Sequence, residues 1–176
     1  MFGGVILIYM LISTIFIAFA TIAFYIFSSI VRYKLAKKRN TNHAWLAWIP
    51  YANLYLLGSI CGPMMLFGKW RIDNPGLVLL FAPIVAWLIS VALGFFSLIP
   101  VLGIIIGIAL AIFSFAWPIV YTAFYLCVLY RIFSSYVSKN MTLVYTLVSL
   151  ISVTMPFFMF SILKKEPICD GYDFTI

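Results

Sequence analysis

The residues of this chain that could perform acid–base, metal or nucleophilic chemistry are few and widely spaced. They are four carboxylates, one histidine and three cysteines, namely Asp73, Glu166, Asp170, Asp173, His43, Cys61, Cys127 and Cys169. A metal site needs clustered ligands, as in HExxH or CxxC spacing, and a hydrolytic site needs a nucleophile beside a base that a carboxylate orients. The sequence indicates neither. We therefore predict no enzyme activity, no metal and no cofactor, with His43 as an interfacial side chain.

One segment does gather aromatic, polar and proline residues within eleven positions, and these are Trp45, Trp48, Pro50, Asn53 and Tyr55. Proline fits the first position of a helix because its missing N–H is not needed there, so a short helix is expected to start at Pro50. Asn53 would lie in the first turn, where its amide could bond free backbone groups or a ligand. If the chain has a ligand or partner site, we expect it in this segment.

Small residues recur at every fourth position in two adjoining apolar segments. They are Ala82, Ala86, Ser90 and Gly94 in the first segment and Gly103, Gly107 and Ala111 in the second. Residues four apart share a helix face, and small side chains let helix backbones approach closely inside lipid. In an antiparallel hairpin Gly94 would face Gly103, and Ser90 would face Gly107. The two stripes predict helix packing, either within the chain or against a second copy or another membrane protein.

The composition places all of these residues in a membrane protein. Apolar residues make up 66% of the sequence and charged residues only 9%, whereas a soluble domain carries about a quarter charged residues. We predict one all-α membrane domain over residues 1–176, a polytopic helical bundle. Its long apolar runs contain no Asp, Glu, Lys, Arg or His, and such side chains usually mark proton relays and ion sites in membranes. A proton-coupled carrier or a metal transporter is therefore not indicated.

Four apolar runs are long enough to span a bilayer, and they cover residues 5–31, 77–99, 101–130 and 141–163. About 20 helical residues cross a hydrocarbon core of about 30 Å. Residues 44–68 are also uncharged, but Pro50 and Gly62-Pro63 interrupt them and leave about 16 Å of helix between the two breaks. We predict that this segment is re-entrant or interfacial, which gives four spans. A kinked full crossing would give five.

The distribution of positive charge decides between these two topologies. Five cations follow the first span directly, namely Arg32, Lys34, Lys37, Lys38 and Arg39. If residues 44–68 return to the same side, nine of the eleven Lys and Arg residues are cytoplasmic and two are outside; if they cross, the division is seven against four. The positive-inside rule favours the first, with both termini outside. We expect the basic patches to contact anionic lipid headgroups, and no nucleic acid.

The segment Trp45 to Gly58, WLAWIPYANLYLLG, resembles a pattern in small bacterial multi-pass membrane proteins that form a domain family of unknown function. The pattern is a Trp, an Ile-Pro, an Asn three residues after the Pro, and then a Tyr and apolar residues up to a Gly. Ile99-Pro100 with Gly103 is similar to a degenerate second copy. The resemblance implies a bacterial cytoplasmic membrane location, and it implies no activity.

The sequence leads to two functional hypotheses. The first is a non-enzymatic accessory or interaction subunit that acts through helix packing in the bilayer, because the small-residue stripes are matched and catalytic groups are missing. The alternative is a small permease or channel for a neutral or hydrophobic solute, because a re-entrant segment with Asn53 and Tyr55 offers polar groups at membrane depth.

Overall fold

The computed structural model describes residues 2–66, 70–97, 99–151 and 153–167, which are almost entirely helical. The elements, in chain order, are α1 (Phe2–Lys38), the 3₁₀ helix η1 (Ala44–Trp48), α2 (Ala52–Cys61), β1 (Met64–Leu66), β2 (Trp70–Ile72), α3 (Pro75–Phe96), α4 (Pro100–Ser134), α5 (Lys139–Val148) and α6 (Met155–Leu163). The two strands pair antiparallel, with Met65 opposite Arg71. The predicted fold class, all-α, is confirmed.

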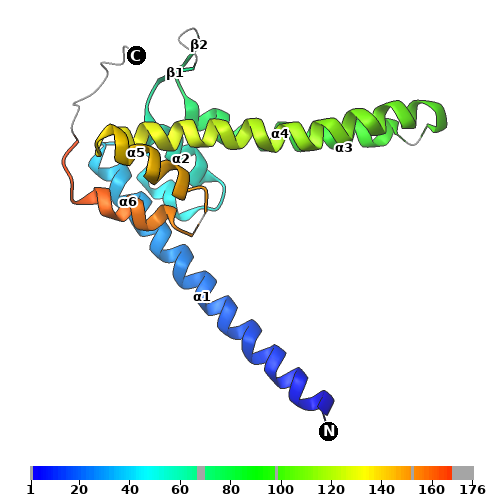
Figure 1. Ribbon diagram of the computed structural model, residues 1–176, viewed down its shortest axis with the longest axis horizontal. Helices are drawn as coiled ribbons and strands as arrows, with labels where there is room; N and C mark the ends of the chain where they lie inside the picture. Colours follow the sequence, from blue (N-terminus) through cyan, green and yellow to red (C-terminus); the bar gives the residue numbers. More distant parts are fainter. Residues whose placement is uncertain (1, 67–69, 98, 152, 168–176) are drawn as a thin grey trace.

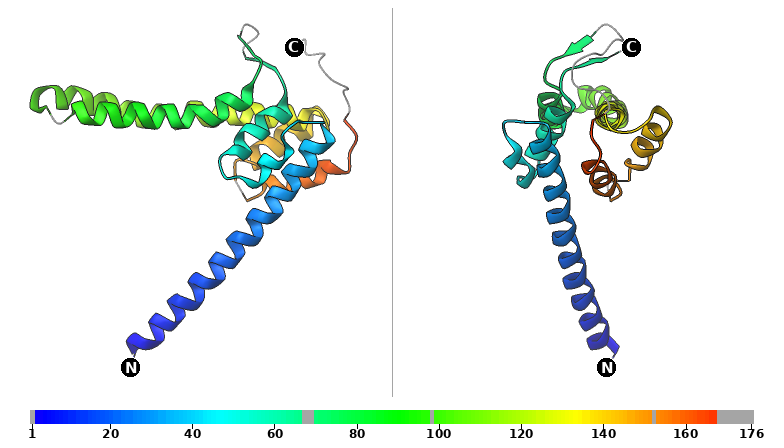
Figure 2. Two further views of the ribbon diagram at one scale, coloured as in Figure 1. Left: turned by 180° about the vertical axis from the view of Figure 1, so that it is seen from behind. Right: turned by 90° about the vertical axis from the view of Figure 1, so that its left-hand side faces the viewer.

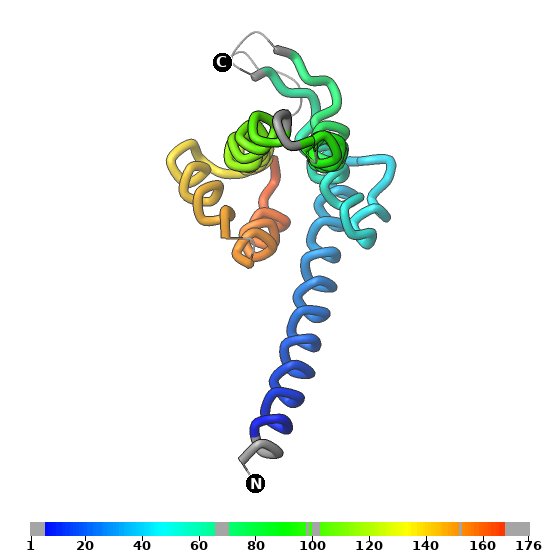
Figure 3. Tube along the Cα trace, turned by 90° about the vertical axis from the view of Figure 1, so that its right-hand side faces the viewer, coloured from blue at the N-terminus to red at the C-terminus, as the bar shows by residue number. Residues whose placement is uncertain are grey.

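The helices form a small packed body from which two long arms extend (Figure 1). The first arm is the N-terminal part of α1, and the second arm is the antiparallel hairpin of α3 and α4. The body contains the C-terminal turns of α1, all of η1, α2, α5 and α6, and the ends of α3 and α4 that lie away from the hairpin tip (Figure 2). Figure 3, which looks along the second arm, shows α1 leaving the body in a different direction.

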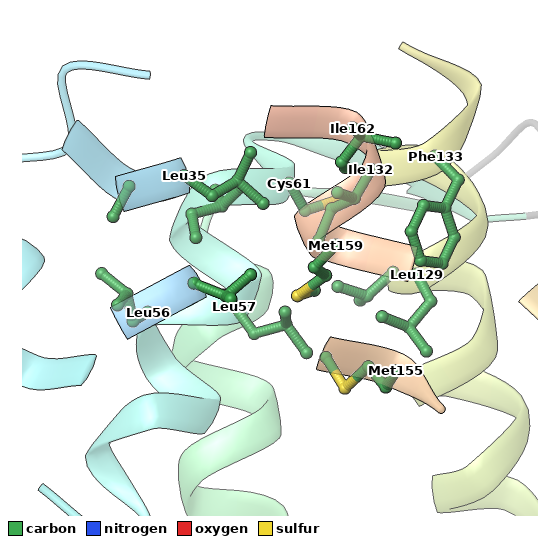
Figure 4. Close-up of a cluster of buried hydrophobic side chains, with 14 of the residues drawn as sticks. Leu35, Leu56, Leu57, Cys61, Leu129, Ile132, Phe133, Met155, Met159 and Ile162 are labelled. Carbon is green, nitrogen blue, oxygen red and sulfur yellow. The ribbon is translucent and has the colours of Figure 1, made fainter. Parts of the chain in front are cut away.

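The hydrophobic core lies in the body and is built from helices that are distant in sequence. Leu35 of α1, Leu56 of α2, Phe133 of α4 and Met159 of α6 are fully buried in one cluster (Figure 4). Along the arms the apolar side chains are instead exposed, for example Phe16 at 74% and Phe115 at 79%. A bare apolar surface of this extent indicates that the arms lie in lipid.

Three helices are long and apolar enough to cross a membrane, judged by length and composition. They cover Ile6–Lys38, Pro75–Phe96 and Gly103–Ser134 among the described residues. These helices correspond to the first three predicted spans, residues 5–31, 77–99 and 101–130. The membrane character that the composition predicted is therefore confirmed at this level.

The fourth predicted span, residues 141–163, differs in the structure because it is divided into α5 and α6. The two helices have ten and nine residues, so each is about 15 Å long or less, half of a hydrocarbon core. Pro156 lies in the first turn of α6, where proline is tolerated, rather than inside a longer helix. The hydroxyl of Thr154 donates to the carbonyls of Val148 and Ile151, which stabilises the turn between the helices.

The predicted breaks in residues 44–68 appear at the expected places. Pro50 separates η1 from α2, and Gly62, with a φ of 73°, ends α2 before β1. The helix starts at Ala52, two residues later than predicted, because Tyr51 has a left-handed backbone with a φ of 67°.

Two glycines let α2 cross the first turn of α3 at backbone contact. A Cβ atom added to Gly58 would lie 2.2 Å from the backbone nitrogen of Gly76, and a Cβ added to Gly76 would lie 2.4 Å from the carbonyl oxygen of Tyr55. Neither position has room for a methyl group, because the obstructing atoms are backbone. Gly58 is also the last residue of the segment WLAWIPYANLYLLG. The lack of space for a Cβ at the crossing explains why this position is a glycine.

We predict that Gly58→Ala destabilises the folded protein by about 3 kcal/mol, because the added methyl forces α2 and α3 apart. Equilibrium unfolding in detergent micelles measures the change. Gly94→Ala is the matched control, since a Cβ there meets nothing within 4 Å. An equal loss of stability in both variants would show that the close crossing is not what requires Gly58.

Candidate functional site

The aromatic segment that sequence analysis singled out lies on the surface of the body beside α1. Trp45, Trp48 and Tyr51 are 58%, 45% and 71% exposed. The hydroxyl of Tyr25, on α1, donates to the carbonyl oxygen of Trp48 at 2.6 Å. This hydrogen bond fixes the position of η1 along the axis of α1. The exposed rings form an apolar surface of the body rather than the lining of an enclosed site.

Pro50, Asn53 and Tyr55, the other residues of that predicted segment, do not converge with the tryptophans on one point. Pro50 is exposed, whereas Asn53 and Tyr55 are half-buried in α2. The backbone N–H of Asn53 donates to the carbonyl of Ile49 at 3.1 Å, which starts α2. The side chain of Tyr55 would lie 3.1 Å from a Cβ at Gly76, so it packs at the α2–α3 crossing.

Basic side chains hold the C-terminal ends of the short helices. Arg39 donates from Nη1 to the carbonyl of Ile60 in the last turn of α2, at 3.1 Å, and from Nε to the hydroxyl of Tyr136, at 3.1 Å. Arg131 donates to the carbonyl of Pro63, just after the same helix, at 3.2 Å. The end of a helix carries partial negative charge and unpaired carbonyls, so cations there are favourable.

Lys38 binds the C-terminal end of α6 in the same way. Its ammonium group donates to the carbonyl of Leu163 at 3.1 Å and to the carbonyl of Lys165. Lys38 and Arg39 also lie over the ring of Tyr136, at 5.4 and 5.0 Å from its centroid. One tyrosine therefore links the end of α1 to the turn after α4.

The five cations predicted to contact headgroups or set topology thus divide into two groups. Lys34 and Lys37 are exposed. Arg32 is turned inward, with Nη2 3.8 Å from the sulfur of Met155 in α6. Together with Lys38 and Arg39 it connects α1 to the rest of the body. The sequence could not assign Arg131 and Tyr136 to this cluster, because the fold alone brings them to α1.

Cys61 is buried in the last turn of α2, near Arg39 and Arg131. Burial raises the pKa of its thiol to about 11, with a smaller opposing effect from the two guanidinium groups. A thiol of this kind is neutral at physiological pH and therefore unreactive. Within residues 2–66, 70–97, 99–151 and 153–167 no group of three or more His, Cys, Asp or Glu side chains is placed to hold a metal ion.

The structure does not bring the two small-residue stripes together in the predicted pairs. Ala86 is buried and Ala82, Ser90 and Gly94 are partly buried, whereas Gly107 and Ala111 are exposed. Gly94 does not pack against Gly103, and Ser90 does not pack against Gly107. A Cβ at Gly94 or Gly107 would meet nothing within 4 Å, and a Cβ at Gly103 would instead meet the carbonyl oxygen of Ser97 at 2.3 Å.

Aromatic residues rather than glycines mediate the contact between the two helices of the hairpin. Phe113, Trp117 and Tyr121 succeed one another every four residues on α4, with ring centroids 5.8 and 6.5 Å apart. All three are partly buried. Gly107 and Ala111 lie beside this aromatic contact and are exposed, on the same side of α4 as Ser114 and Pro118.

Comparison of the chain with protein-family models, with curated proteins and with solved structures finds no match. The geometry described above is therefore the basis for any functional assignment.

We predict that Arg39→Gln destabilises the protein by about 3 kcal/mol, because two charge-assisted hydrogen bonds are lost and the Ile60 carbonyl loses its donor. Unfolding in detergent micelles measures this loss. The matched control is Arg71→Gln, which removes the exposed ion pair of Arg71 with Asp73 (2.9 Å) and should cost less than about 1 kcal/mol. If Arg39→Gln were as mild as Arg71→Gln, the cation at the end of α2 would not hold the body together.

Proposed function

We propose that this chain is a non-enzymatic membrane protein that acts as an interaction subunit, binding other helices within the bilayer through the outer face of its α3–α4 hairpin. The observation that carries the proposal is the exposed stripe of Gly107 and Ala111 on α4, which no part of the described chain covers. Small residues on a lipid-facing helix allow a second helix to approach closely. The partner is a second copy of this chain or another membrane protein.

The proposal includes a membrane topology with three crossings, by α1, α3 and α4. Both arms leave from the same body (Figure 2), so residues 44–68 and the α5–α6 pair stay on one side. That side then carries all eleven Lys and Arg residues of the sequence. The arrangement with four spans and a re-entrant segment leaves two of them on the other side, and the positive-inside rule favours the more uneven distribution.

The depth of the aromatic segment supports an interfacial rather than a re-entrant position for residues 44–68. Along α1, Ile6 and Tyr25 are separated by about 28 Å, close to the thickness of a hydrocarbon core of about 30 Å. Because Tyr25 bonds to Trp48, the exposed rings of Trp45, Trp48 and Tyr51 lie at the level where the core ends. Tryptophan and tyrosine are enriched at this level.

Lys34 and Lys37 lie nine and twelve residues beyond Tyr25 on α1 and are exposed, and their long side chains suit contact with anionic headgroups. The body would thus rest on the cytoplasmic surface of the membrane. The resemblance of residues 45–58 to small bacterial multi-pass proteins supports the bacterial cytoplasmic membrane as the location.

A photocrosslinking amino acid at Gly107 or Ala111 tests the proposed interaction in native membranes. We expect each position to give a discrete crosslinked band, either a dimer of this chain or an adduct with one membrane protein. The matched control is Ile112, which is 64% exposed on the same helix but lies outside the small-residue stripe. Mixing tagged and untagged copies of the chain distinguishes the dimer from the heterologous adduct.

A monomer without adducts at Gly107 and Ala111, or adducts equally strong at Ile112, would contradict the proposal. The absence of adducts would mean that only lipid contacts that face. The second would indicate random collisions between helices in the membrane.

A further inference from the structure

A cavity of about 280 Å³, open along one side of the hairpin, lies between α3 and α4, midway along the second arm. Its lining includes two prolines, two serines and two tryptophans: Pro83, Trp87 and Ser90 from α3, and Ser114, Trp117 and Pro118 from α4. No charged side chain lines it. Because both helices are apolar over this stretch and their outer faces are bare, a ligand would reach the cavity from the hydrocarbon part of the bilayer.

Each of the two prolines leaves one carbonyl group without its helical donor. One of these carbonyls accepts a hydrogen bond from a side chain of the facing helix, and the other does not. Pro83 cannot donate to the carbonyl of Leu79, and the hydroxyl of Tyr121 on the facing helix donates to it instead, at 3.1 Å. Pro118 in the same way cannot donate to the carbonyl of Ser114. Within the part of the chain that the structure describes, no side chain donates to this second carbonyl.

The serine hydroxyls that line the cavity are further acceptors, because their protons are already donated elsewhere. Ser90 donates its hydroxyl proton to the carbonyl of Ala86, and Ser114 donates its proton to the carbonyl of Leu110, both at 2.8 Å. Their oxygens stay able to accept. The indole N–H groups of Trp87 and Trp117 are the side-chain donors that the lining residues carry besides these serines.

We infer that this cavity binds a neutral, largely apolar molecule that carries a hydroxyl group and enters from the bilayer. The hydroxyl donates to the carbonyl of Ser114, as Tyr121 does to the carbonyl of Leu79, and the apolar part lies against the rings of Trp87 and Trp117. An ion is disfavoured, because no charge faces the cavity to balance it. This site goes beyond the proposed interaction at Gly107 and Ala111 and does not depend on it.

The test uses the full-length chain in phosphatidylcholine vesicles and a long-chain alcohol that carries a diazirine near its hydroxyl end. The comparison probe is the same molecule as its methyl ether, which has equal apolar length but no donor. Mass spectrometry quantifies labelling of peptides from α3 and α4. One hydrogen bond of typical strength predicts about fivefold more labelling by the alcohol than by the ether.

Pro118→Ala is the decisive variant, because the new backbone N–H can donate to the carbonyl of Ser114 while the cavity stays open. We expect the preference for the alcohol to disappear. Pro83→Ala is the matched control and should keep the preference, since it restores a donor to Leu79 and not to Ser114. Ala86→Leu should reduce labelling by both probes by filling the cavity, whereas Ala116→Leu, at an exposed position on the opposite side of α4 from Ser114 and Pro118, should not.

Equal labelling by alcohol and ether in the unchanged chain would overturn the inference, because it would mean that any acyl chain fills the groove. A preference for the alcohol that survives Pro118→Ala would also overturn it. Crosslinking at Gly107 can succeed or fail independently of either result, so the two proposals are tested separately.

Discussion

The structure depends on one constraint, namely that an ionised side chain in hydrocarbon costs several kcal/mol. Residues 5–31, 77–99 and 101–130 contain no charge, so the cations of the chain stand at one end of each long helix. Those ends meet in the body, and there the cations bind carbonyl oxygens. Arg39 and Arg131 hold the end of α2, and Lys38 holds the end of α6. The groups that are costly to place in hydrocarbon therefore stabilise the body.

A second constraint is the close crossing of α2 over α3, where neither Gly58 nor Gly76 has room for a side chain. The crossing returns the chain to the body at the start of the hairpin, so α3 begins on the side where α1 ended. The hairpin itself is spaced by aromatic rings, and the exposed stripe of Gly107 and Ala111 continues along α4 to Ser114 and Pro118, which line the cavity. The two proposed binding surfaces thus follow from one choice of packing residues.

The sequence predicted the helical membrane class and the breaks around Pro50 and Gly62, because charge, length and proline act locally. It missed the division of residues 141–163, since an uncharged run of 23 residues looks like a span until α5 and α6 find partners in the body. It also misassigned the glycine contacts. The four-residue spacing of Gly103 and Gly107 is visible in the sequence, but the register of α4 against α3 depends on contacts such as that of Tyr121 with the Leu79 carbonyl.

The side of the membrane on which the polar segments lie tests this account most directly. Single cysteines at Asp73, Ser138 and Glu166, in a chain whose own cysteines are replaced, report their side by reaction with a membrane-impermeant maleimide in sealed right-side-out vesicles. The account predicts that all three resist the reagent until the vesicles are opened. Labelling of Glu166 but not Ser138 in sealed vesicles would mean that residues 141–163 cross, and labelling of Asp73 would mean that residues 44–68 cross. Either result would contradict a body gathered on one face.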